Sequence, residues 1–150
     1  MEELYEAYFT LLDKFGEQLD RLSELAKRKN VAAKRGDVLT VNECMKEEQT
    51  ISLTLRRMDQ QRVKVLAALG LQNVPLSALA NRCPPAQRQA ARAAADSLIR
   101  KRELYRAAAD ASRSTLECAL HNVEKLIEAN VPGGMAERRA HSGVFTDFRT

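Results

Sequence analysis

Glycine and proline constrain the fold of this chain more than any other feature of its sequence. Breaks stand at Gly36, at Gly70 and at the pair Pro84-Pro85, and the next follows at Pro132-Gly133-Gly134. Good helix formers, mainly Ala, Leu, Arg, Lys, Glu and Gln, dominate the stretches between these breaks. The spacing predicts three long helices, over residues 3–35, 38–69 and 84–130.

The composition supports an all-α fold in a single helical domain. Hydrophobic residues make up 45% of the chain and charged residues 29%, whereas aromatic residues reach 5% and tryptophan is absent. A β-rich domain would carry more aromatic and β-branched side chains. We therefore expect one helical domain over residues 1–131 and a C-terminal tail over residues 132–150. No apolar run approaches the roughly 20 residues that span a bilayer, so we expect no membrane span. The acidic start Met1-Glu2-Glu3 is not a signal peptide, and three widely spaced cysteines predict reduced thiols, so we expect a cytoplasmic protein.

Apolar side chains repeat along the first two helices at steps of three and four residues. In the first helix this stripe runs through Tyr8, Leu12, Phe15, Leu19, Leu22 and Ala26. The short break at Gly36-Asp37 makes the second helix antiparallel to the first. The predicted fold is an elongated up-down-up antiparallel three-helix bundle or coiled coil with an overlong third helix.

Two charged residues, Glu48 and Arg62, fall on the apolar stripe of the second helix. Folding the hairpin at its break places Arg62 near Asp13, and Glu48 near Arg21 or Arg28. Buried charges are costly unless they are paired. We therefore interpret Glu48 and Arg62 as structural charges that fix the register of the helices.

Charge is distributed along the chain in blocks of opposite sign. Residues 1–26 contain seven acids and two bases, and residues 27–35 contain five bases and no acid. Residues 82–106 contain seven bases and two acids, and residues 107–130 contain four acids and two bases. In an up-down-up bundle the unlike blocks meet, so the pattern favours this topology.

The predicted third helix is longer than the other two. At 1.5 Å per residue, the first two helices reach about 50 Å and the third about 70 Å. Its last turns should therefore pass the Gly36-Asp37 corner. They carry an apolar stripe that has no partner left in the chain: Leu116, Leu120, Val123, Leu126 and Ile127. Such a stripe is typical of a docking surface, unless the helix kinks or the tail covers it.

Short segments of the first two helices occur in a characteristic order. They are Ala33-Lys34-Arg35-Gly36-Asp37-Val38-Leu39, Lys46-Glu47-Glu48-Gln49, Leu55, Arg62, Leu66 and Leu69-Gly70-Leu71. In this order the chain resembles the FlgN family of flagellar type III export chaperones, over about residues 4–71 and more loosely along the third helix.

The resemblance implies a cytoplasmic chaperone for hook-associated (hook–filament junction) proteins. Such a chaperone binds the C-terminal helical segments of its clients, prevents their premature assembly and delivers them to the type III export apparatus. In the family the C-terminal amphipathic helix binds the client, and this helix corresponds here to the stripe from Leu116 to Ile127. Family members also contact the export apparatus near their C-termini, and no residue of this chain is matched to that contact.

Two other functions stay open on the sequence alone. The stripe on the third helix could pair with a second copy, which would make the chain a coiled-coil scaffold or a homodimeric adaptor. Nucleic-acid binding is less favoured, because the seven bases of residues 82–106 are scattered around the helix and Tyr105 is their single aromatic companion.

The tail is polar but ends in a hydrophobic group, Val144, Phe145 and Phe148. We expect these side chains to pack on a surface. That surface is either the bare end of the third helix, where the tail would mask an empty client site, or a neighbouring molecule.

No pattern in the sequence indicates catalysis. His121 and His141 are isolated, and no close pair of cysteine or histidine residues has metal-ligand spacing. The wide spacing of Cys44, Cys83 and Cys118 predicts reduced thiols packed as small hydrophobic residues. We expect a binding protein that is not an enzyme and that needs no cofactor and no metal.

Overall fold

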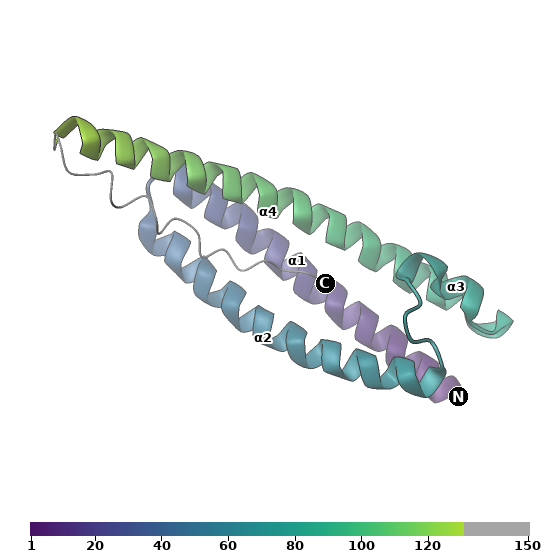
Figure 1. Cartoon of the computed structure of the whole chain (residues 1–150). Helices are drawn as coiled ribbons and strands as arrows, with labels where there is room; N and C mark the ends of the chain where they lie inside the picture. Colours follow the sequence, from purple (N-terminus) through teal and green to yellow (C-terminus); the bar gives the residue numbers. More distant parts are fainter. Residues whose placement is uncertain (131–150) are drawn as a thin grey trace.

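In the computed structural model, residues 1–130 are described, and they form an elongated all-helical molecule (Figure 1). The elements are α1 (Glu2–Lys34), α2 (Val38–Leu69), α3 (Leu79–Arg82) and α4 (Arg88–Asn130), and two short 3-10 helices at Leu76–Ala78 and Pro85–Gln87. The all-α prediction is confirmed, and the long helices begin and end within four residues of the predicted limits.

Local residues fix both ends of α2. Gly36 lies at φ 71° and Gly70 at φ 70°, in the left-handed region that costs a side-chain-bearing residue energy. Asp37 caps the start of α2, because its carboxylate accepts hydrogen bonds from the backbone N–H of Thr40 at 3.2 Å and from its hydroxyl at 2.6 Å. These bonds hold the pKa of Asp37 below its ordinary value. The corner between α1 and α2 is thus encoded within a few residues.

The connector between α2 and α4 closes one end of the molecule. Its buried side chains pack in one cluster with Tyr5 and Tyr8 of α1 and with Ala91 of α4. They are Leu71, Leu79, Ala80 and Cys83. The short helical turn expected after Pro75 forms as the 3-10 helix Leu76–Ala78 followed directly by α3.

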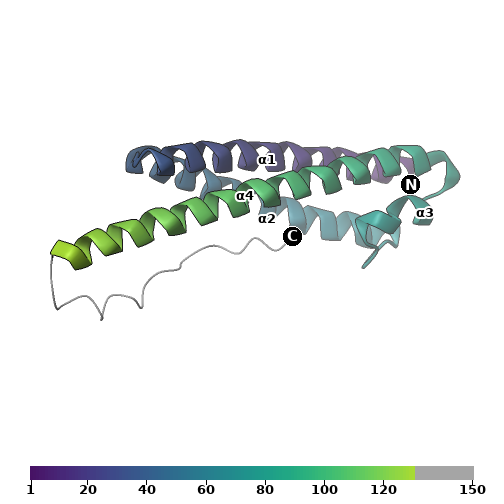
Figure 2. The ribbon, with the colours of Figure 1, turned by 90° about the horizontal axis from the view of Figure 1, so that it is seen from above.

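The arrangement corrects the prediction of a three-helix bundle in two respects. First, α3 is a fourth α-helix, packed on α4. Second, α1 is central: its backbone approaches both α2 and α4, whereas the backbones of α2 and α4 scarcely approach each other. Figures 1 and 2 show α2 antiparallel to α1 and α4 running back in the same direction as α1. The up-down-up order of the long helices is therefore as expected, but they do not form a symmetric bundle.

Small residues explain the close approach of α4 to α1. Ala91 and Ala95 of α4 are 0% and 3% exposed. On α1, the position of a Cβ at Gly16 would lie 3.1 Å from the Cδ atom of Lys101. Without larger side chains between them, the two helices come close along this stretch.

The apolar stripe predicted on α1 is buried at every position: Tyr8, Leu12, Phe15, Leu19, Leu22 and Ala26. Along the middle of the molecule these side chains join Cys44, Ile51, Leu55 and Met58 of α2 in a second cluster, against which Leu98 and Tyr105 of α4 pack. The core is therefore a continuous strip along α1, covered from two sides.

Glu48 lies in the interface between α1 and α2, but its partner differs from the prediction. Its carboxylate accepts hydrogen bonds from the Nζ of Lys29 at 2.8 and 3.1 Å, and both side chains are less than a fifth exposed. The expected partners bond elsewhere: Arg21 pairs with Glu47 at 2.6 Å and Arg28 with Glu43 at 3.7 Å. Glu43 and Glu47 lie one turn apart on the more exposed flank of α2, so they meet the exposed arginines, whereas Glu48 turns inward.

Arg62 pairs within its own helix and not with Asp13. Its guanidinium lies 2.8 Å from Asp59, three residues earlier on α2, and its side chain is 40% exposed. Asp13 is exposed on α1, one residue beyond the buried Leu12, and so points away from the interface.

Candidate functional site

The last turns of α4 extend beyond the corner between α1 and α2. Lys101 of α4 lies level with Gly16 of α1, and its Nζ pairs with Asp20 at 2.8 Å. Arg35, at the end of α1, lies nineteen residues after Gly16. Leu120 lies nineteen residues after Lys101 on α4, which runs in the same direction, so Leu120 is level with the end of α1. The helix continues to Asn130, which is about 15 Å further. Figures 1 and 2 both show this free end, in yellow-green, projecting past the corner.

The predicted stripe occupies this projecting end. Leu120 is 48% exposed, Val123 51%, Leu126 64% and Ile127 37%. Leu116 is half-buried, because it lies four residues before Leu120 and so is still alongside the last turn of α1. We call these five residues the distal stripe. The structure thus brings them together on one exposed segment of helix.

The distal stripe continues the helix face that packs against α1 upstream. On α4, positions seven residues apart are buried or partly buried: Ala91, Leu98, Tyr105 and Ser112. Leu116 and Val123 follow Ser112 by four and eleven residues, which places them on the same face at 3.6 residues per turn. The face is therefore continuous, and its upstream half is covered by α1 while its far half is bare among residues 1–130.

Three exposed apolar residues at the corner were not predicted. They are Val31, 48% exposed, Val38, 65%, and Leu39, 78%. The available signal was their position, because Val38 and Leu39 precede the apolar stripe of α2, which runs through Val41, Cys44, Ile51, Leu55, Met58, Val65 and Leu69. The corner thus adds apolar surface at the end of α1.

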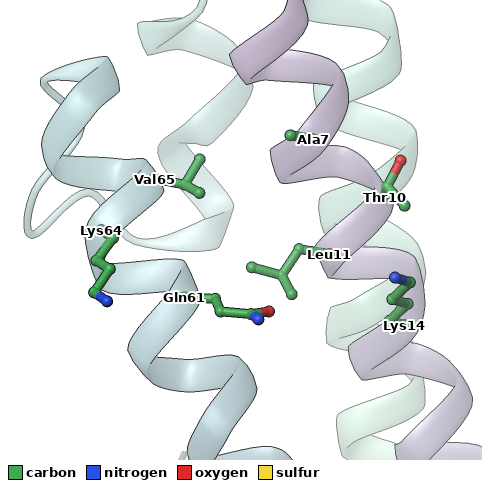
Figure 3. A pocket seen from close by; sticks show the side chains of 7 residues that line it. All are labelled: Ala7, Thr10, Leu11, Lys14, Gln61, Lys64 and Val65. Carbon is green, nitrogen blue, oxygen red and sulfur yellow. The ribbon is translucent and has the colours of Figure 1, made fainter.

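A shallow groove of about 300 Å³ lies between α1 and α2 (Figure 3). In it, Leu11 of α1 and Gln61 of α2 extend toward each other. The other lining residues are Ala7, Thr10, Lys14, Lys64 and Val65. No sequence pattern had indicated this groove, and its lining contains no carboxylate or imidazole for acid–base chemistry.

The cysteines differ from the prediction at one position. Cys44 and Cys83 are buried, and burial raises the pKa of both thiols, so they behave as packed apolar residues. Cys118 is exposed, because it lies two residues after Leu116 and so turns away from the stripe.

Residues 1–130 contain no group of three or more His, Cys, Asp or Glu side chains that could hold a metal ion. Over the same residues, no helix combines the length and the apolarity that crossing a bilayer requires. The tail residues Val144, Phe145 and Phe148 lie outside the part of the chain that the structure describes.

Comparisons with known proteins identify a family. The family model described as FlgN protein matches residues 1–137. No curated protein and no solved structure matches the chain. Because the family match covers most of the 150 residues, the chain belongs to the FlgN family of flagellar export chaperones.

Proposed function

We propose that this protein is a cytoplasmic chaperone that binds the C-terminal helical segments of hook-associated proteins. It keeps these segments from assembling before secretion and delivers them to the type III export apparatus. Family membership supports the chaperone role. The proposed position of the binding site rests on the exposure of the distal stripe, because four of its five side chains are more than a third exposed.

The binding mode is a helix laid against a helix. An amphipathic client helix covers the distal stripe with its own apolar face. Complete burial of a leucine-sized side chain contributes about 1.5–3 kcal/mol, and association itself costs about 4–15 kcal/mol. A stripe of five such residues therefore supports reversible binding, which a chaperone that must release its client requires.

The test is the double variant Leu120→Asp with Val123→Asp, measured by titration against C-terminal segments of hook-associated proteins. We expect loss of client binding with unchanged helical content by circular dichroism, because both side chains are about half exposed and contribute little to the core. The matched control is Ser114→Asp with Cys118→Asp, which adds the same acids at exposed positions on the side of α4 that faces away from the stripe. Equal binding by the variant and its control would contradict the proposal.

A homodimer is the second candidate, because the distal stripe could equally cover its counterpart in another copy. Measurement of the molecular mass in solution separates the two functions. A stable dimer that dissociates on Leu120→Asp with Val123→Asp and ignores client segments would favour a scaffold.

A further inference from the structure

The distal stripe has one acidic border and one uncharged border. Glu117 and Glu124 lie seven residues apart, and therefore on one line of α4 beside the stripe. On the opposite border, the positions seven residues apart are uncharged: Thr115, Asn122 and Ala129. The surface that a partner would cover is thus electrostatically asymmetric.

The packing of α4 on α1 follows a rule of opposite charge. The base-rich stretch of residues 82–106 lies along the acid-rich start of α1, residues 1–26. The ion pair between Lys101 and Asp20, at 2.8 Å, is a direct instance. Further along, the base-rich end of α1, residues 27–35, comes level with the start of the acid-rich part of α4, residues 107–130. The base-rich first part of α4 therefore meets a segment of α1 of the opposite sign.

Glu117 lies level with the last turn of α1, and Glu124 lies beyond the corner, where α1 has ended. Among residues 1–130, neither Glu117 nor Glu124 forms an ion pair. Of the two bases of this stretch, Arg113 lies on the same side of α4 one turn before Glu117 without forming an ion pair with it, and Lys125 lies on the outward face. The apolar face and, at Glu124, its acidic border thus continue past the point where α1 ends.

We propose that the distal stripe accepts an amphipathic helix that continues the line of α1 along α4 and carries Lys or Arg beside its apolar face. These bases meet Glu117 and Glu124 across the acidic border. The inference rests on the proposed function, and it adds which helices the chaperone accepts. The apolar stripe supplies affinity, whereas the acidic border selects among amphipathic helices and sets their orientation.

The probes are three synthetic amphipathic helices with the same Leu and Ile stripe at three- and four-residue spacing. They differ at two positions seven residues apart on one border, which carry Lys, Gln or Glu. Binding to the full chain is measured by isothermal titration at low and at high salt. We expect the Lys peptide to bind about tenfold more tightly than the Glu peptide at low salt, and this preference to shrink as salt rises.

Reversing the charge of the two border acids tests whether they cause the preference for the Lys peptide. Glu117→Lys with Glu124→Lys should reverse the preference, so that the Glu peptide binds more tightly than the Lys peptide. The matched control is Asp96→Lys with Glu103→Lys, which changes the net charge equally at two exposed positions of α4, also seven residues apart, in the half that α1 covers. The control should keep the preference of the original chain.

The outcomes separate this inference from the proposed function. Equal binding of all three peptides, or a preference that the exchange does not reverse, overturns the charge selection and leaves the client site in place. Failure of every peptide and of the hook-associated segments overturns both. A dimer held together by the distal stripe makes a second copy the occupant and likewise overturns the inference.

Discussion

The two halves of α4 use one helix face in opposite ways. The first half presents small residues, Ala91 and Ala95, to α1, and they are almost completely buried. The second half presents larger residues, such as Leu120 and Val123, which are about half exposed. If burial of apolar surface alone had shaped this helix, the larger side chains would lie where the core is. The covered half therefore combines close helix approach at the alanines with packed side chains at Leu98 and Tyr105, whereas the far half leaves large apolar side chains exposed, as the proposed docking role requires.

Truncating one leucine in the core and one in the distal stripe tests whether the far end of α4 is separate from the core. Leu22 of α1 is 0% exposed and Leu126 of α4 is 64% exposed. Leu22→Ala should lower the free energy of unfolding by about 2–5 kcal/mol, because it leaves a cavity in the core. Leu126→Ala should change it by less than about 0.5 kcal/mol. Urea denaturation measures both, and similar losses would mean that the far end of α4 is part of the core.

The second prediction enlarges a small residue where the helices meet. Ala91 is 0% exposed, so Ala91→Leu should destabilise the fold by about 1–3 kcal/mol through overpacking against α1. Ala111 lies on the exposed side of the same helix, and Ala111→Leu is the matched control that should leave the thermal midpoint nearly unchanged. A fold that tolerates Ala91→Leu equally well would show that α4 does not rest closely on α1.

The third and smallest effect compares a paired acid with an unpaired one. Glu48→Gln removes the charge that Lys29 contacts at 2.8 Å in a largely covered interface, and it should cost about 1 kcal/mol of unfolding free energy. Glu124→Gln on the acidic border should leave stability unchanged and weaken binding of the lysine-bordered peptide. If Glu124→Gln destabilised the isolated chain as much as Glu48→Gln does, the acidic border would be structural and not a recognition surface.

The resemblance seen in the sequence and the match to the family model indicate the same family, and they cover different parts of the chain. The order of segments around Gly36-Asp37 and Leu69-Gly70 identified the FlgN family from the first two helices, and the family match extends to residue 137. The assignment of client binding to the distal stripe comes from its exposure beyond the corner and stays a prediction. So does the division into a helical domain over residues 1–131 and a tail.

Local sequence was enough to predict the three long helices, the breaks between them and the apolar stripe near the end of α4. These features are local: a glycine in the left-handed region, a capping aspartate and a repeat of three and four residues act within a few turns of the chain. The pairing of charges depends on the packed helices. The predicted Arg62–Asp13 contact is replaced by Arg62–Asp59, and Glu48 bonds to Lys29 and to neither predicted arginine. It also decided that α1 is the central helix and that Val38 and Leu39 are bare. Such outcomes depend on the stagger and rotation of whole helices against each other, which the packing of distant side chains sets and no short segment encodes.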